Sequence, residues 1–237
     1  MIVDFNNKKV FKFKNRPEHH EELVKSFFLK SKKGFFVDVG ANDPKKDSQS
    51  YHLEQDGFTG LLIEPLPYCC DKLRKDRTSK VIQLACSNKK NHGKYLSLID
   101  ADEHSTLNTD LIARGIHEEK KISVMCSTLD KILEENNVLI EFDFLSVDIE
   151  GHEMEMFDGF SIKKWKPKLI ILEDHVLDHK KHNYMKKNSY KLIFRTGLNS
   201  WYVPCHLNFK LSFSSKIEFF RKYWLAIPMR KLMYKRF

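Results

Sequence analysis

The sequence contains no long apolar run. Among its 237 residues, no stretch approaches the roughly 18 consecutive apolar residues that a membrane-spanning helix needs. The first residues, MIVDFNNKKVFKF, are interrupted by polar and charged side chains and lack the apolar core of a signal peptide. The sequence therefore predicts a cytoplasmic protein, in which any membrane contact is peripheral.

Cysteines in paired spacing are also missing. The five cysteines stand at positions 69, 70, 86, 126 and 205, with no C-x-x-C pair among them. An odd number without that spacing favours reduced thiols in a cytosolic compartment and argues against a zinc site.

Positive charge is scarce outside one segment. The net charge is +9, but residues 210–237 hold eight Lys or Arg residues against the single acid Glu218. This segment carries +7, so the other 209 residues sum to only +2. The basic character therefore belongs to the C-terminal segment, and the body of the chain is close to neutral.

Short apolar runs alternate with helical patterns through the middle of the chain. The candidate strands are residues 35–39, 60–64, 80–85, 142–148, 168–173 and 191–195. The candidate helices lie near residues 48–56, 67–76, 128–136, 151–158 and 178–188. This order predicts right-handed βαβ units, and hence an α/β fold with a mostly parallel central sheet covered by helices on both faces. Runs such as FFVDV and LIILE are apolar at consecutive positions, as strands buried on both faces should be.

Three regions stand apart from this alternation. Residues 93–126 are interpreted as an inserted pair of strands joined by a polar loop, followed by a helix with Ser127 or Thr128 as its N-cap. Before the first strand, RPEHHEELVKSFFLK has the pattern of an amphipathic helix. We therefore expect an N-terminal strand and helix in residues 1–33, a central domain in 34–209 and a basic amphipathic segment in 210–237.

Acidic residues stand at the ends of several predicted strands. In a parallel sheet, ligands bind outside the carboxyl ends of the strands. The residues at those ends are Asp38-Val39-Gly40-Ala41-Asn42, Glu64, Ala85-Cys86, Asp148 and Glu173-Asp174. More carboxylates meet there than a core requires, which indicates a binding site.

The loop after the first strand argues against a dinucleotide. Gly40 allows a tight turn and a close approach of the backbone to a ligand. It is the only glycine of G-A-N-D-P, whereas a pyrophosphate is bound by G-x-G-x-x-G. Glu64 is placed to accept hydrogen bonds from ribose hydroxyls, which a nicotinamide enzyme would also need. An adenosine ligand without phosphates fits better, and S-adenosylmethionine is the common one.

Several motifs occur in an order that resembles the FkbM-type methyltransferases. They are FVDVGAND, GLLIEPLP, VIQLACSNKK, HSTLN, CSTLDKIL, FLSVDIEGHEMEMFDGF and KPKLIILEDH, and the resemblance covers about residues 34–204. It implies a class I, Rossmann-like methyltransferase that uses S-adenosylmethionine and acts on a hydroxyl oxygen. Members of the family often modify sugars, glycans or secondary metabolites.

The resemblance also implies roles for individual residues. Asp38, Gly40 and Asn42 would line the methionine end of the cofactor, with Asp148 close by. Glu64 would hold the ribose, and Ala85 with Cys86 would flank the adenine. This sequence departs from the family pattern at Asp43-Pro44, where a glycine often follows the asparagine by one residue, and at Ser146, where a lysine is frequent.

Methyl transfer to a hydroxyl benefits from a general base. Asp148 is the first candidate because it ends a strand beside the expected methyl position, and His152, four residues on, could share the role. Alternatively, Glu150, Glu173 and Asp174 could join Asp148 in holding Mg²⁺, which prefers oxygen ligands. A surface position is an equally good interpretation of His152.

The C-terminal segment adds a question of partners. Apolar residues at 220, 223, 224 and 227 share one helical face, and Pro228 predicts two short helices rather than one. Such a segment fits peripheral contact with an anionic membrane, or docking on the protein body or a second subunit. The leading interpretation is a methyltransferase for a hydroxyl of a sugar, glycan or related metabolite. An RNA ribose 2′-O-methyltransferase and a non-catalytic membrane-associated protein remain alternatives.

Overall fold

A computed structural model of the chain describes residues 24, 27, 28, 33–100, 107, 120–209 and 213–234. The chain forms two compact units, residues 31–170 and residues 171–237 with 1–30. Nearly all of the predicted N-terminal strand and helix lies outside the described residues. The division into residues 1–33, 34–209 and 210–237 stays a prediction.

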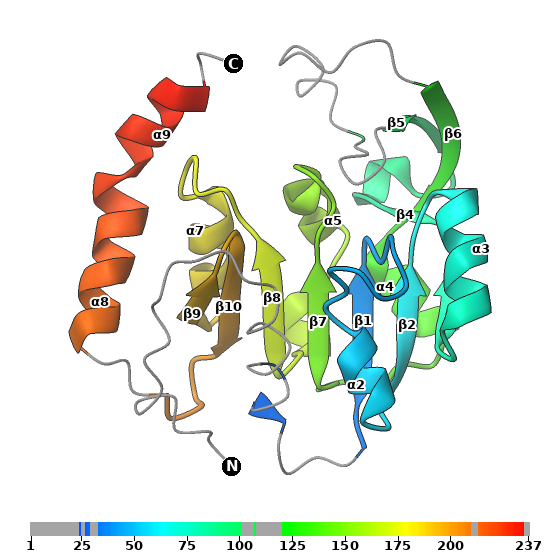
Figure 1. Ribbon diagram of the computed structural model, residues 1–237, viewed down its shortest axis with the longest axis horizontal. Helices are drawn as coiled ribbons and strands as arrows, with labels where there is room; N and C mark the ends of the chain where they lie inside the picture. The colour runs from blue at the N-terminus through cyan, green and yellow to red at the C-terminus, as the bar shows by residue number, and fades with distance from the viewer. Residues whose placement is uncertain are drawn as a thin grey trace. The chain divides into compact units, whose positions relative to one another are not determined.

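Four parallel strands form the sheet of the 31–170 unit (Figure 1). In spatial order they are β3 (Lys80–Ile82), β2 (Thr59–Ile63), β1 (Phe35–Val39) and β7 (Phe144–Val147). Val39, the last residue of β1, is in register with Ile63 and with Val147, the last residues of β2 and β7. Three carboxyl ends therefore meet at one edge, as the sequence predicted.

Helices connect the strands of this unit. They are α2 (Tyr51–Gln55), α3 (Pro67–Asp76), α4 (Leu129–Glu135), α5 (Glu153–Asp158) and α6 (Ile162–Trp165), with a short 3₁₀ turn, η2 (Lys89–Asn91). The predicted bounds of α3 are confirmed. Helix α4 begins after Thr128, whose side chain accepts a hydrogen bond from the Lys131 N–H at 3.2 Å, as an N-cap does. Helix α2 is shorter than predicted because the Ser48 side chain accepts the backbone N–H of Ser50 and of Tyr51 in a turn.

The inserted pair of strands is confirmed, but the strand predicted just before it, at residues 80–85, was predicted wrongly. Strand β5 (Tyr95–Asp100) pairs antiparallel with β6 (Lys120–Ser127), and β6 pairs parallel with β4 (Ala85–Cys86) in a separate three-stranded sheet. The single strand predicted at 80–85 is therefore two strands, β3 and β4, in two sheets. A cluster of buried apolar side chains fixes β4 against β5 and β6: Leu66, Cys69, Ala85, Leu98, Val124 and Cys126.

The 171–237 unit contains most of β8 (Leu169–Glu173), which continues into it from the other unit, and the strands β9 (Tyr190–Thr196) and β10 (Asn199–Pro204). The strand order is β8-β10-β9, and β9 and β10 are antiparallel. Strand β10 was not among the predicted strands. Helix α7 (Lys180–Lys187) connects β8 to β9 along the chain.

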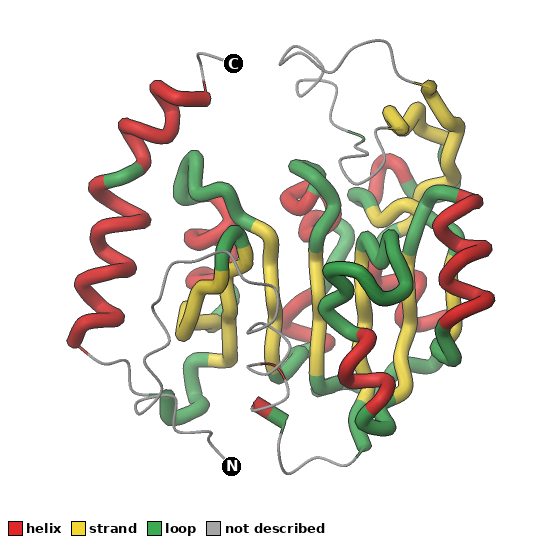
Figure 2. The backbone as a smooth tube through the Cα atoms, in the orientation of Figure 1, coloured by secondary structure: helices red, strands yellow, loops and turns green. Residues whose placement is uncertain are grey.

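The C-terminal segment is helical (Figure 2). It comprises α8 (Phe213–Phe220), a π-helical turn (Arg221–Leu225) and α9 (Ile227–Tyr234). The two predicted short helices are confirmed, with Pro228 in the first turn of α9, where proline removes no intrahelical hydrogen bond. Within the described part of the chain, no helix has both the length and the apolar character needed to cross a bilayer.

Candidate functional site

A cavity of about 250 Å³ opens at the carboxyl ends of β1, β2 and β7. The residues predicted to bind cofactor or to act in catalysis all line it. They are Asp38, Gly40, Asn42, Glu64, Ala85, Cys86, Asp148 and His152. They come from four separate stretches of the chain, so the parallel topology brings them together. Their individual roles stay predictions.

Gly40 makes the turn that brings the β1 loop against β7. Its φ is +85°, and its backbone N–H donates to the Ile63 carbonyl oxygen at 2.9 Å. A Cβ at this position would lie 1.8 Å from the carbonyl oxygen of Asp148, far inside the van der Waals distance. Only glycine therefore allows the loop to pass this close to the candidate base.

Asp38 is buried beneath the cavity, and its carboxylate is fixed by hydroxyl groups. The Ser50 hydroxyl donates to its Oδ2 at 2.5 Å, and the Ser146 hydroxyl bonds it from the neighbouring strand. Burial raises the pKa of Asp38, while Ser50, the charge of Arg77 and Ser146 act in the opposite direction. Ser146, a departure from the family pattern, thus takes part in holding Asp38.

A buried arginine that the sequence analysis missed organises the loop over the cavity. The Arg77 side chain is fully buried and forms an ion pair with Glu54 through its Nε, at 3.2 Å from Oε2. Its Nη1 donates to the Pro44 carbonyl oxygen at 3.1 Å and to the Ser48 hydroxyl at 3.3 Å. Its Nη2 donates to Ser50 at 3.1 Å, which in turn holds Asp38. Arg77 is therefore a positioning residue for the 43–50 loop.

The conformation of this loop accounts for the departure from the family pattern at Asp43-Pro44. The Asp43 carboxylate accepts the backbone N–H of Lys45 at 2.9 Å and of Lys46 at 2.8 Å. These bonds form a local turn of the kind that aspartate favours. Together with the Arg77 bond to Pro44, they give residues 43–46 a defined conformation without the glycine.

Glu64 lies at the end of β2 with both carboxylate oxygens already hydrogen-bonded. Oε2 accepts the Asn42 N–H at 3.0 Å, and Oε1 accepts the Leu66 N–H at 2.9 Å. Burial raises the pKa of Glu64 to about 7, against the lowering effect of these two bonds, and the charge of Asp38 raises it further. Each carboxylate oxygen has a second lone pair, so Glu64 can still accept two hydroxyl hydrogens.

Apolar atoms and protonated thiols form the side of the cavity at β4. Ala85 and Cys86 are buried, and burial raises the pKa of the Cys86 thiol far above its usual range. At neutral pH this side chain is therefore a neutral, weakly polar surface, which suits the face of a heteroaromatic ring. The Cys69 thiol donates to the Asn42 side-chain oxygen at 3.3 Å and so connects α3 to the cavity loop.

Asp148 and His152 differ in how they are held. Asp148 is half-buried, and its backbone N–H donates to the Val39 carbonyl oxygen at 3.0 Å. The His152 Nε2 lies 2.9 Å from the hydroxyl of the fully buried Ser87, which also accepts the Asn91 amide at 2.9 Å. Burial lowers the pKa of His152, which favours the neutral imidazole, and its Nε2 shares a hydrogen bond with the Ser87 hydroxyl. The His152 ring is thus held by Ser87 in the cavity lining, and the role of Asp148 as the general base stays a prediction.

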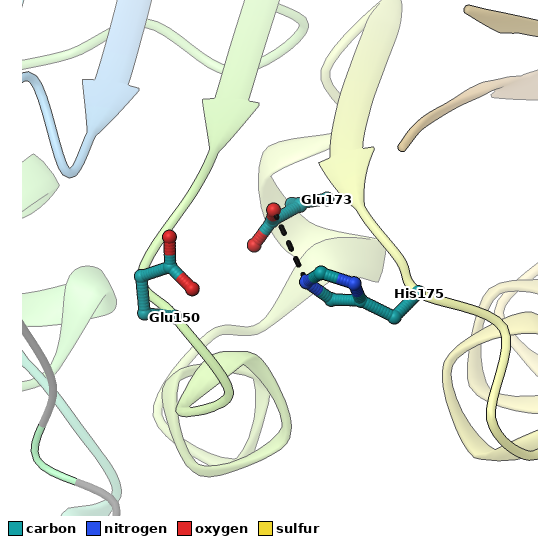
Figure 3. Close-up of side chains that lie close together, drawn as sticks. All are labelled: Glu150, Glu173 and His175. Carbon is teal, nitrogen blue, oxygen red and sulfur yellow. Dashed lines mark ion pairs between the residues drawn. The ribbon is translucent and has the colours of Figure 1, made fainter. Parts of the chain in front are cut away.

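The candidate metal ligands belong to both units. Glu173 and His175, in the 171–237 unit, form an ion pair with 3.4 Å between Oε1 and Nε2 (Figure 3). The Asp174 carboxylate accepts the Val176 N–H at 2.8 Å and the Tyr223 hydroxyl at 3.3 Å, so both its oxygens are used within that unit. A magnesium site of Asp148, Glu173 and Asp174 stays a prediction.

The charge of the cavity lining is strongly asymmetric. Six carboxylates line it, against the single ammonium group of Lys46. They are Asp38, Asp43, Asp47, Glu64, Asp148 and Glu150. Among the described residues, the cavity is therefore a favourable environment for a cation and an unfavourable one for a phosphate.

The sequence match decides the family. The chain matches the methyltransferase FkbM domain over residues 38–192, a segment that begins at Asp38 and includes every cavity residue. The chain belongs to the FkbM methyltransferase family. The resemblance drawn from the motifs is thereby confirmed, and so is the α/β fold with its mostly parallel sheet. Among curated proteins, no sequence matches this FkbM chain.

Solved structures of similar fold are distant in sequence. The N-terminal domain of human METTL16 in complex with SAH is 13% identical, with 80% of this chain and 69% of that chain covered and a TM-score of 0.43. Precorrin-6y C5,15-methyltransferase from Geobacter metallireducens GS-15 is 11% identical, with coverages of 85% and 95% and a TM-score of 0.42. We infer no acceptor for the FkbM chain from similarities of this size.

Proposed function

We propose that the protein is an S-adenosylmethionine-dependent O-methyltransferase for a hydroxyl of a sugar, glycan or related metabolite. The observation that carries the proposal is the acidic cavity at the ends of β1, β2 and β7. S-adenosylmethionine brings a sulfonium and an ammonium group, which six carboxylates attract, whereas the pyrophosphate of NAD would be repelled. The tight turn at Gly40 also leaves no cradle of glycines for a phosphate.

The cavity residues match the parts of this cofactor. The side chains and backbone of Asp38, Gly40 and Asn42 would surround the methionine end, with Asp38 held in place by Ser50. Glu64 keeps lone pairs for the two ribose hydroxyls. The adenine ring would lie against Ala85 and Cys86. The chemistry of these residues supports the proposal of this cofactor.

When bound, the cofactor supplies an electrophilic methyl group on sulfur. The chain then has to orient the acceptor hydroxyl in line with the carbon–sulfur bond, and good alignment can contribute roughly 7–11 kcal/mol. The Asp148 carboxylate would accept the hydroxyl proton while the oxygen–carbon bond forms and the carbon–sulfur bond breaks, so that the sulfur leaves as a neutral thioether. His152 holds the β4 end of the cavity through Ser87 and is a positioning residue in this proposal.

The same charges favour a neutral acceptor. A ribose within RNA would bring flanking phosphates to the cavity, whose lining includes Asp43, Asp47 and Glu150. A sugar or glycan without phosphates carries no such charge, and its other hydroxyl groups can donate hydrogen bonds to these carboxylates. Mass spectrometry of glycans and metabolites, from cells with and without the protein, should find a product heavier by one CH₂ unit.

Calorimetry separates the cofactor classes. We expect binding of S-adenosylmethionine and S-adenosylhomocysteine and no binding of NAD. Binding of NAD alone would contradict the proposal. Binding of S-adenosylmethionine with methyl transfer to RNA rather than to any glycan or metabolite would keep the cofactor and overturn the acceptor.

Replacing Asp148 with asparagine should abolish most turnover. Without the base, we expect the methyl transfer rate to fall by about 10²–10⁴, with a much smaller change in S-adenosylhomocysteine affinity. The matched control is Asp47→Asn, which removes another cavity carboxylate without a proposed role in the reaction and should retain activity within a few-fold. Equal losses in both variants would show that negative charge in general, rather than a base at Asp148, is what the reaction requires.

Cofactor affinity should depend on pH through Glu64. The pKa of this carboxyl is about 7 in the folded protein, and only the ionised form can accept hydrogen bonds from both ribose hydroxyls. Below pH 7 binding must first release a proton, so we expect S-adenosylhomocysteine affinity to fall by up to about tenfold per pH unit. Calorimetry in two buffers of different ionisation enthalpy measures that proton. In Glu64→Gln the affinity should be lower and should no longer depend on pH in this range. An unchanged dependence on pH would show that another group titrates.

The raised pKa of Glu64 also makes the stability of the folded protein depend on pH. The folded protein holds the Glu64 proton more tightly than the unfolded chain, so this stabilising effect is complete below pH of about 4.3. It is lost as the pH rises through about 7.

A further inference from the structure

A polar cluster holds the C-terminal helices within the 171–237 unit. The Tyr223 hydroxyl lies 2.7 Å from the Ser200 hydroxyl and donates to the Asp174 carboxylate at 3.3 Å. His179 donates through Nε2 to the Tyr223 carbonyl oxygen at 2.5 Å, and its ring centroid lies 4.5 Å from that of Trp224. Tyr223 and its neighbours Lys222 and Ile227 are buried. The segment is thus a fixed part of its unit and presents a defined outer face.

That outer face is apolar. Of the thirteen large hydrophobic side chains that are exposed in the described residues, seven lie between positions 213 and 232. They are Phe213, Ile217, Phe220, Trp224, Leu225, Met229 and Leu232, from 52% to 79% exposed. We refer to these seven residues as the apolar stripe. Residues 213, 217, 220 and 224 follow one another at intervals of three or four, and so do 225, 229 and 232, as on one side of a helix.

Positive charge accompanies the apolar stripe. The segment 210–237 carries eight Lys or Arg residues against one acid, and Lys216 and Arg221 are exposed beside the stripe. Large apolar and aromatic side chains next to lysine and arginine are typical of helices that lie in the interface of an anionic bilayer. There the apolar side chains enter the acyl boundary while the basic groups meet the lipid phosphates.

We propose that the apolar stripe binds the surface of an anionic membrane. An anionic membrane accounts for both the apolar and the basic side chains of this face, because it offers an apolar acyl region and negatively charged headgroups together. A second copy of the chain would offer the apolar contact, but a two-fold interface would bring two segments of charge +7 against each other. Nucleic acid offers the negative charge, but its phosphate backbone gives no partner for seven aliphatic and aromatic side chains. The proposal does not depend on the enzymatic activity.

Vesicle flotation with the full-length protein tests the proposal. One set of vesicles is pure phosphatidylcholine, and in the other one lipid in four is phosphatidylglycerol. We expect the protein to float with the anionic vesicles and to be released in large part by high salt, because screening weakens the basic contacts. Little or no flotation should occur with phosphatidylcholine alone.

Point variants test the proposal better than removal of the segment does, because removal would expose Ser200 and Asp174 to solvent. The test variant is Phe220→Ser with Met229→Ser, two exposed residues of the stripe. The control is Leu139→Ser with Ile140→Ser, which are 80% and 58% exposed in the other unit. We expect at least tenfold weaker vesicle binding in the test variant and none of this loss in the control, with unchanged thermal unfolding in both.

Three results would overturn the proposal. The first is wild-type protein that stays unbound with anionic vesicles. The second is equal flotation of the test variant and the wild type. The third is a wild-type dimer, seen by light scattering, that the test variant converts to a monomer without any vesicle binding; this would assign the stripe to a second copy of the chain.

Discussion

Replacing Arg77 with methionine is expected to destabilise the protein by about 3–5 kcal/mol, the cost of breaking a buried ion pair from one side. Methionine has a similar length but no donor, so Glu54, the Pro44 carbonyl oxygen and Ser50 all lose a hydrogen bond. Urea unfolding followed by circular dichroism measures the change.

The matched control is Arg74→Met, in the last turn of α3 and three residues before Arg77. Arg74 is half exposed and pairs with Asp71 at 3.0 Å, three residues earlier, so its loss should cost less than about 1 kcal/mol. Equal midpoints for the two variants would show that the Arg77 network is not a source of stability. Affinity for S-adenosylhomocysteine adds a second measurement, because Arg77→Met should weaken it through the 43–50 loop and Arg74→Met should not.

The cavity could be predicted because its acidic residues lie at the ends of the predicted strands. Consecutive apolar residues locate β1, β2 and β7, and in a parallel sheet the residues that follow such strands must meet. Asp38, Glu64 and Asp148 could therefore be grouped from the sequence although they are far apart along it. Gly40 was predictable for a similar reason, since a single glycine directly after a buried strand indicates a tight turn.

Arg77 could not be found in the same way. It follows the last residue of α3, where a basic side chain is favourable in any helix and carries no further information. Its partners Glu54, Pro44 and Ser50 are 23 to 33 residues away, and their contacts exist only once α2 and α3 are packed. Its cation–π contacts with Phe36 and Tyr51 are equally non-local.

The split between β3 and β4 has a comparable cause. Residues 80–86, KVIQLAC, are apolar except for Lys80 and Gln83, and a single polar residue such as Gln83 is compatible with one continuous strand. The change of sheet depends on β6, a strand about 40 residues further along, which takes Ala85 and Cys86 as its parallel neighbours. A consequence is that Cys86 and Ser87 are placed by the inserted strands, and Ser87 then fixes His152. The insertion thus contributes to the cavity, which local pattern alone does not reveal.

Replacing Gly40 with alanine should disrupt the cavity itself. Two costs combine: the positive φ of +85° strains any L-residue by about 1–2 kcal/mol, and the Cβ would lie 1.8 Å from the Asp148 carbonyl oxygen. Since that oxygen belongs to the backbone, the β1 loop and the end of β7 must move apart. We expect a total loss of stability of about 3–5 kcal/mol and at least tenfold weaker binding of S-adenosylhomocysteine.

Gly93→Ala separates the two costs. Gly93 also has a positive φ, +74°, but a Cβ there meets nothing within 4 Å. This variant therefore carries the backbone strain without the contact, and we expect a loss of only about 1–2 kcal/mol with unchanged ligand affinity. If Gly40→Ala lost no more stability than Gly93→Ala and still bound the ligand, the close approach of Gly40 to Asp148 would not be what shapes the cavity.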